Sequence, residues 1–150
     1  MKPNVLAAAS ATLFALMCSV PLPLSAREAK AKPLASYRHK NRVLLVFASG
    51  HKDASYQEQM KLWQNEKAGF EDRQLVIVSV LADGQGNTAD EPATLVKRFG
   101  VAPDAFKVVL VGKDGHNAYG SAKPIPADTL YGRIDAMPMR REEMKRPPTR

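Results

Sequence analysis

Two short runs of continuous apolar residues constrain most strongly how this chain folds. Residues 43–48 (Val-Leu-Leu-Val-Phe-Ala) and 75–81 (Leu-Val-Ile-Val-Ser-Val-Leu) contain many β-branched side chains and one serine as their only polar residue. A half-exposed strand alternates apolar and polar residues, whereas a strand buried on both faces is apolar throughout. We therefore predict two buried strands, the first of them central in a sheet covered by helices.

The segment between these strands has the spacing of a helix. Tyr56, Met60 and Trp63 recur at i, i+4 and i+7 across residues 53–68, which places them on one face. Either Asp53 or Ser55 can accept a backbone hydrogen bond as the N-cap. We predict a helix over these residues, with Trp63 packed against the first strand.

The remaining elements alternate in the same way. We predict a loop over 82–92, a helix over 93–99, strands over 106–111 and 117–121 with a turn between them, and helices over 126–137 and from 138 to about 145. The order is therefore βαβαββα. Because strands separated by helices pair through crossovers, this order predicts a mixed sheet covered on both faces.

The first 26 residues have the features of a signal peptide. Lys2 is followed by an apolar run over 5–20, two prolines, and the small residues Ser25 and Ala26. The run is short for a membrane anchor, which is the alternative. We expect cleavage after Ala26 or a few residues away, since Leu24 is not ideal three positions before the cut, a periplasmic or secreted location, and a mature protein with no transmembrane span.

The only cysteine of the chain lies in this leader. Cys18 follows Met17, a larger residue than those that precede lipid-modified cysteines, so we expect no lipid anchor. If cleavage follows Ala26, the mature chain has no thiol, and disulfides, thiolate metal ligands and thiol redox chemistry are excluded together. We predict four segments: a signal peptide (1–26), a basic linker (27–36), one domain (37–146) and a disordered tail (147–150).

Three segments resemble known proteins of one fold. Residues 43–49, 97–103 and 108–115 resemble corresponding segments of thioredoxins and peroxiredoxins. The longer matches, over residues 37–47 and 134–144, resemble a bacterial family of secreted proteins of unknown function. That family is similar to a domain of the extracellular-matrix protein Equarin and of sushi-repeat proteins. The resemblance implies an α/β, thioredoxin-like three-layer sandwich with a mixed central sheet.

The resemblance does not extend to redox chemistry. Thioredoxins have Cys-x-x-Cys just after the first central strand, where this chain has Lys52-Asp53-Ala54-Ser55. Thioredoxins also have a cis-proline before the next core strand, where this chain has Phe106, with Pro103 three residues earlier. We assign no catalytic residue and expect no cofactor.

Basic residues gather at the two ends of the mature chain. Residues 27–42 contain six basic and one acidic residue, and residues 140–150 contain five basic and two acidic ones. Such ends can contact acidic polymers or lipid head groups, or they can be solvated tails. The candidate anion-binding residues are Arg38, His39, Lys40, Arg42, Arg140 and Arg141. The alternative for Lys40 and Arg42 is pairing with carboxylates near Glu71 and Asp72.

Three functions remain open. The first is a non-catalytic binding or structural module with an unknown envelope or extracellular partner. The second is an enzyme that uses non-thiol groups such as His51 and Asp53 at the former active-site mouth. The third is a binder of polyanions or of the envelope surface. A metal at His51 would need a further ligand such as Asp83 or His116, and because no metal-ligand spacing is present we expect none.

Overall fold

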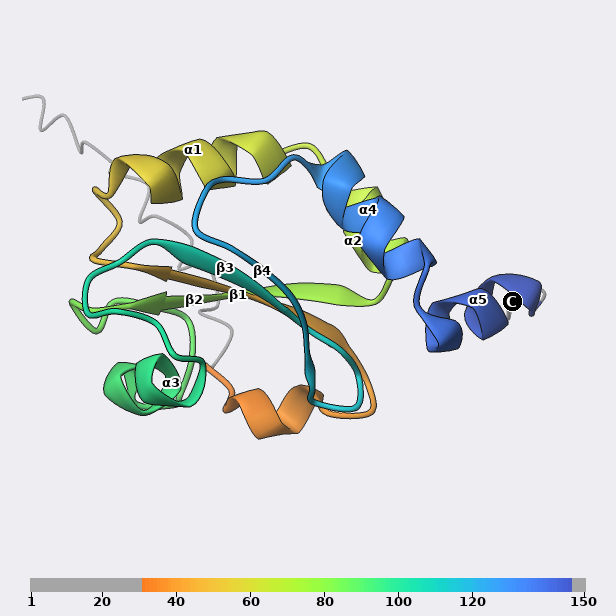
Figure 1. The fold of residues 1–150 in the computed structure, drawn as a ribbon, viewed down its shortest axis with the longest axis horizontal. Coiled ribbons are helices and arrows are strands. Elements are labelled where there is room, and N and C mark those ends of the chain that lie inside the picture. The colour runs from red at the N-terminus through yellow and green to blue at the C-terminus, as the bar shows by residue number, and fades with distance from the viewer. Residues whose placement is uncertain (1–30, 147–150) are drawn as a thin grey trace, which may run out of the picture.

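A computed structural model describes residues 31–146, which form one mixed four-stranded sheet with helices on both faces (Figure 1). The strands are β1 (Arg42–Ala48), β2 (Leu75–Leu81), β3 (Lys107–Val111) and β4 (Asn117–Ser121), in the order β2-β1-β3-β4. β1 pairs with β2 in parallel and with β3 antiparallel, and β3 pairs with β4 antiparallel. The predicted mixed sheet and the central place of the first strand are confirmed.

The second apolar strand lies at an edge of this sheet. β2 has β1 as its neighbour on one side only, and its residues Val76 and Ile77 are half-buried. The other residues of the strand are buried because helices cover both faces of the sheet. A continuous apolar run therefore marks burial of the two faces, which does not require a strand partner on each side.

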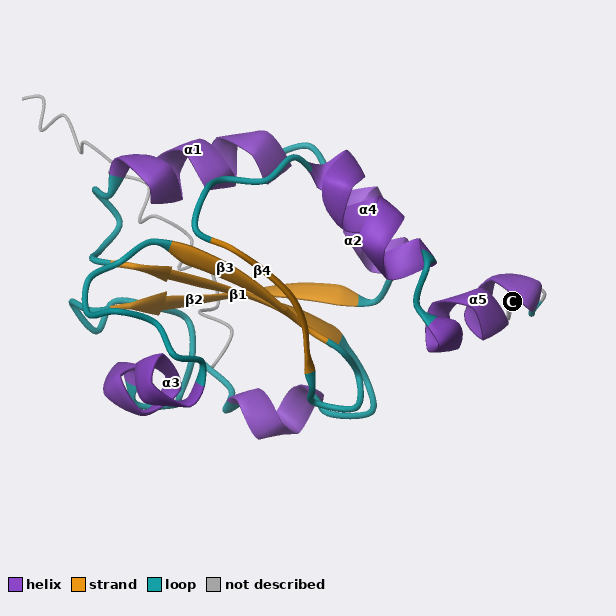
Figure 2. Cartoon of the chain, in the orientation of Figure 1, coloured by secondary structure: helices purple, strands orange, loops and turns teal. Residues whose placement is uncertain are grey.

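The helices form two layers around the sheet (Figure 2). α1 (Ala54–Trp63), α2 (Lys67–Asp72) and α4 (Ala127–Asp135) lie on one face. α3 (Pro92–Arg98) and the 3-10 helix η1 (Leu34–Tyr37) lie on the other. α5 (Pro138–Lys145) extends beyond the sheet at the end opposite the start of α1. The predicted three-layer α/β arrangement is confirmed.

Alternate residues of β1 enter two separate cores. Leu44 and Val46 pack in a cluster with Trp63 of α1 and with residues of α2 and α4. Leu45 and Phe47 pack in a second cluster with η1 and α3. The indole nitrogen of Trp63 donates to the carbonyl of Ile125 at 3.0 Å, which satisfies its one buried polar group. The predicted contact of Trp63 with the first strand is confirmed.

The predicted helix over residues 53–68 is two helices. Asp53 is the N-cap of α1, because its carboxylate accepts from the backbone N–H of Tyr56 at 3.1 Å. The helix ends at Trp63, and α2 begins at Lys67. Gly69 was predicted to end the helix but lies inside α2, where a Cβ would overlap the ring of Tyr131. Its small size therefore serves a close approach of α2 to α4.

The folded part begins within the segment predicted as a linker. Leu34 is buried, and its backbone N–H donates to the carboxylate of Asp90 at 2.6 Å. Residues from Leu34 onward thus belong to the body. The predicted signal peptide, the start of the linker and the tail 147–150 lie outside the described residues. Within the described part, no helix combines the length and apolar character that crossing a membrane requires.

Candidate functional site

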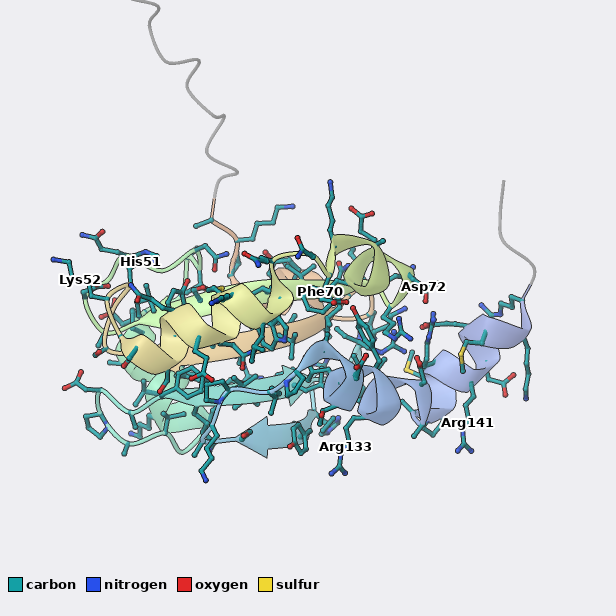
Figure 3. The ribbon with its side chains drawn as sticks, turned by 90° about the horizontal axis from the view of Figure 1, so that it is seen from above. His51, Lys52, Phe70, Asp72, Arg133 and Arg141 are labelled. Carbon is teal, nitrogen blue, oxygen red and sulfur yellow. The ribbon has the colours of Figure 1, made fainter. Side chains whose placement is uncertain are left out.

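The loop between β1 and α1 forms one wall of a shallow polar mouth. The mouth is an open cavity of about 550 Å³ lined by Ser49, Gly50, His51, Lys52, Asp53, Asp83 and Gln85. It lies where the resemblance to thioredoxins places the redox cysteines. His51 and Lys52 lie at this end of the molecule in Figure 3, away from Asp72 and Arg141.

Most polar groups of the mouth bind one another. Asp53 accepts from the Tyr56 backbone with one carboxylate oxygen and from the Ser49 hydroxyl, at 3.1 Å, with the other. His51 places Nε2 3.1 Å from the carbonyl oxygen of Gln85, and its ring meets that of Tyr56 edge-on at 5.5 Å. These contacts fix the conformation of the loop, and within it each carboxylate oxygen of Asp53 accepts one hydrogen bond.

The ligand-type side chains of the mouth do not converge as a metal-binding set within the described residues. Asp83 lines it together with His51 and Asp53, and its carboxylate accepts from the Gln85 backbone at 2.9 Å. His116, the other suggested ligand, lies near the turn between β3 and β4, with its Nδ1 3.3 Å from a carboxylate oxygen of Asp114. Over residues 31–146 no group of three His, Cys, Asp or Glu side chains could hold a metal ion.

The opposite end of the sheet contains a buried arginine. Arg42, the first residue of β1, is 1% exposed, and its guanidinium donates to both carboxylate oxygens of Glu143 at 3.1 and 3.3 Å. It also donates to the carbonyl of Arg73 at 2.9 Å. A bidentate pair of this kind is among the stronger charged contacts in proteins. Arg42 thus attaches α5 to the start of the sheet.

Further ion pairs surround this contact. Lys113 donates to Glu143 at 2.6 Å, and the buried Arg140 donates to Asp72 and, at 3.2 Å, to Asp135. Arg73 binds Asp135 through two hydrogen bonds of 3.0 and 2.7 Å. We call this group the α5 cluster; its members are Arg42, Asp72, Arg73, Lys113, Asp135, Arg140 and Glu143. Four cations thus meet three carboxylates, so the cluster is nearly neutral.

The surrounding cations shift the protonation of two carboxylates. Burial alone would raise the pKa of Glu143, but hydrogen bonds from Lys113 and Arg42 outweigh it and lower the pKa. Burial also opposes the shift at Asp135, whose pKa is lowered by hydrogen bonds from Arg73 and Arg140. Both carboxylates are therefore charged at neutral pH and serve as partners of the buried cations.

The six predicted anion-binding residues divide into two sets. Arg42 and Arg140 are buried in the α5 cluster, where protein carboxylates already bind them. Arg38, His39, Lys40 and Arg141 are exposed. The partner of Arg42 is Glu143, and not the carboxylates near Glu71 and Asp72 that were the alternative. The two basic segments do meet in space, but through buried pairs rather than one continuous free surface.

Sequence analysis missed Lys113, Glu143, Asp135 and Arg73 as members of this cluster. Their one sequence signal is the proximity of Glu143 to Arg140 and Arg141 in a helix, which suggests intrahelical pairs. The long-range partners come from the β3–β4 turn and from the ends of α2 and α4. Only the folded chain brings them together.

The sheet order, the strand directions and the three layers define an α/β domain of the thioredoxin fold. The reduced 2-Cys peroxiredoxin of Plasmodium vivax is similar, at a TM-score of 0.55 and 17% identity over 74% of this chain and 84% of that one. Thioredoxin peroxidase I of Plasmodium yoelii gives a TM-score of 0.57 at 17% identity over 77% and 83%. A thioredoxin-fold protein of Helicobacter pylori gives 0.47 at 14% identity over 65% and 69%.

A family model also matches most of this chain. The chain belongs to the family described as Domain of unknown function (DUF4174), which matches residues 33–143. The match begins one residue before Leu34, the first buried residue of the described part, and ends at Glu143 of the α5 cluster. The family therefore spans η1 to α5, and the cluster that attaches α5 is inside it.

Proposed function

We propose that this domain is a non-catalytic binding module that acts without thiol chemistry. The observation that supports this most is the state of the mouth. Where thioredoxins have cysteines, this chain has Lys52 and Ser55. The carboxylate of Asp53, between them, accepts a hydrogen bond from the backbone of α1 with one oxygen and from the hydroxyl of Ser49 with the other. A loop that is held by hydrogen bonds within the protein is suited to a rigid contact surface, because little order has to be gained when a partner binds.

The module works outside the cytoplasm in this proposal. The charge-free stretch between Lys2 and Arg27 and the resemblance to secreted proteins support export, with an envelope or extracellular partner. The relation to the domain of Equarin and the sushi-repeat proteins belongs to the same proposal. Mass spectrometry of the extracytoplasmic fraction should find an N-terminus near Arg27. Intact protein that begins at Met1 in the cytosol would contradict export.

Activity assays test the absence of thiol chemistry. The purified protein should neither reduce insulin disulfides nor consume peroxide with a thiol reductant. Sustained thiol-dependent turnover, free of contaminating reductases, would overturn the proposal. The enzyme alternative makes a different prediction, because turnover of any substrate should then be lost in His51→Ala at unchanged thermal stability.

A second candidate function is polyanion binding by the exposed cations. Arg38, His39, Lys40 and Arg141 are exposed, and over residues 31–146 none of them forms an ion pair. Attraction of this kind would release counterions and fall steeply with salt. Arg42 and Arg140 are excluded from this role, because carboxylates of the protein already bind both side chains.

A heparin column with a salt gradient tests this second function. The variant Arg38→Ala/Lys40→Ala/Arg141→Ala should elute at clearly lower salt than the wild type. The matched control, Lys52→Ala/Lys61→Ala/Lys123→Ala, removes three exposed cations elsewhere on the surface. It should elute at a salt concentration between those of the wild type and of the first triple variant. If both triple variants elute at the same salt concentration, net charge alone explains the retention, and a defined polyanion-binding surface is rejected.

A further inference from the structure

We propose that a small cavity beside η1 binds a compact oxyanion of about the size of phosphate. The cavity has a volume of about 170 Å³ and lies on the α3 side of the sheet. Leu34, Val43 and Val111 form its apolar part, and Arg38 and Arg98 are its two cations. The proposal names a ligand class for the binding module and rests on that proposed function.

The two arginines reach the cavity from segments far apart in the chain. Arg38 follows η1, and Arg98 ends α3, yet both line the same small space. No acidic side chain lines this space, and across the described residues neither arginine has a carboxylate partner within 4.0 Å. Arg42, Arg73 and Arg140, in contrast, all bind protein carboxylates. An anion in the cavity would supply the missing countercharge.

Each arginine is held by a contact that leaves donors free. Arg38 donates only Nε, to the carbonyl of Asp114 at 3.1 Å, so its two terminal amino groups have no protein acceptor in the described part. The Arg98 guanidinium lies 5.3 Å above the ring of Phe99, which packs on Phe47 at 6.0 Å. Guanidinium groups oriented in this way bind oxyanions through paired N–H donors at a reduced entropic cost.

The backbone around the cavity is fixed before any ligand binds. Gly115 has a φ of +85° and donates to the carbonyl of Gly112 at 2.9 Å, which closes the turn after β3. A Cβ at Gly115 would lie 3.4 Å from Nε of Arg38, so the glycine allows the close approach of that side chain. His39 has a φ of +62° and donates its backbone N–H to Lys113 at 2.7 Å.

The volume limits the class of ligand. Cavities that bind drug-sized molecules measure about 300–1,000 Å³, and this one is smaller, at about 170 Å³. A phosphate-sized oxyanion fits it, either free or as the terminal group of a phosphomonoester whose remainder stays in solvent.

A titration by NMR at constant ionic strength tests the proposal. Inorganic phosphate should shift the backbone amide signals of Gly112 and Gly115 saturably, with half-saturation below about 1 mM. Glycerol 3-phosphate is the second arm. Tighter binding of glycerol 3-phosphate would assign the site to phosphomonoesters, and tighter binding of phosphate would assign it to the free ion. Absence of saturable shifts at 10 mM of either probe would overturn the proposal.

Variants connect the binding to the two arginines. Arg98→Gln and Arg38→Gln should each weaken phosphate binding about tenfold or more, because each removes a charged pair of donors. Arg133→Gln is the matched control, since Arg133 is also exposed and lies over a ring, that of Tyr119 at 4.7 Å. His51→Ala should bind phosphate like the wild type, so a failure of the proposed function at the mouth would leave this result unchanged.

Thermal melts identify variants that do not fold. If Arg98→Gln unfolds, the Arg98→Lys variant tests the proposal instead. Lysine retains the positive charge but lacks the planar pair of guanidinium donors, so this variant should bind phosphate with intermediate affinity. Wild-type affinity in the folded Arg98 variants, or an equal loss in Arg133→Gln, would reject the cavity as the binding site.

Discussion

At the scale of single residues, burial determines which charges are structural. Arg42 is a charged residue at the start of the central strand, and it is tolerated there because Glu143 and a backbone carbonyl bind its guanidinium. A buried charge without such partners is costly. Arg38, only four residues earlier, is exposed and lines a cavity instead. Two arginines of one basic segment thus have different roles.

Replacement of one carboxylate tests this difference. Glu143→Gln leaves Arg42 and Lys113 without their anion and should lower the free energy of unfolding by about 3 kcal/mol. The neighbouring Glu142→Gln is the control, because Glu142 and Lys145 form an exposed pair that contributes about 0–1 kcal/mol. Urea unfolding measures both. A similar small loss in both variants would show that the α5 cluster does not stabilise the domain.

At the scale of elements, contacts between helices override local preferences. Gly69 lies in the middle of α2, where alanine is the better helix former by about 1 kcal/mol. The glycine is required because the ring of Tyr131, whose hydroxyl donates to Glu66 at 2.6 Å, occupies the space of a Cβ. Burial and the bond to Glu66 raise the pKa of Tyr131 to about 12, so the ring stays neutral in this contact.

The same substitution at two helical glycines should have opposite effects. Gly69→Ala should destabilise the domain by about 1–3 kcal/mol, because Tyr131 and α4 must move. Gly132→Ala in α4, where a Cβ would meet nothing within 4 Å, should stabilise it by up to about 1 kcal/mol. Thermal melts of the two variants compare them directly. Stabilisation by both would mean that α2 and α4 do not approach each other this closely.

Helix α1 depends on one large side chain. Trp63→Ala removes a buried indole from the core formed with Leu44 and Leu130 and leaves the carbonyl of Ile125 with one donor fewer. We expect a loss of about 3–5 kcal/mol in the free energy of unfolding. Leu62→Ala is the control, since Leu62 is an exposed neighbour at 39%. An unchanged denaturant midpoint in Trp63→Ala would place the indole outside the core.

At the scale of the whole molecule, the two ends of the sheet differ in chemistry. One end is the polar mouth at the start of α1, and the other is the α5 cluster, which joins β1, α2, α4, α5 and the segment after β3 (Figure 3). α5 contributes the charged Arg140 and Glu143 to the body, while Met139 and Met144 are half exposed. Attachment of this helix is therefore largely ionic.

Ionic attachment predicts sensitivity to acid. The lowered pKa values of Glu143 and Asp135 mean that the folded state favours their charged forms. Their contribution to stability is then complete above the unfolded pKa values, near 4.5 and 3.8, and is lost as the pH falls through the lower folded values. Urea midpoints measured from pH 7 to pH 2 should decline below about pH 4.5. Glu143→Gln should decline less steeply, and a parallel decline would contradict the assignment.

The sequence by itself determined the four strands, the last helix and the fold class, but not η1 or the division of residues 53–68 into two helices. β2, β4 and α5 have the predicted boundaries, and β1 and β3 differ from them by one residue. These features depend on local patterns, namely continuous apolar runs, helical spacing and turn residues, which act over a few neighbouring positions. The absence of a redox cysteine pair is likewise a property of the sequence alone.

Only the tertiary structure decided which basic residues are free. Arg42 and Arg140 find Glu143 and Asp72, 101 and 68 positions away, and Arg98 joins Arg38 at one cavity although 60 positions separate them. No local sequence pattern predicts these long-range contacts, because they depend on the register of β1 with β3 and on the position of α5. The sequence alone does not distinguish an arginine that binds a carboxylate of the protein from one that is free to bind an anion from solution. The partner depends on the tertiary structure.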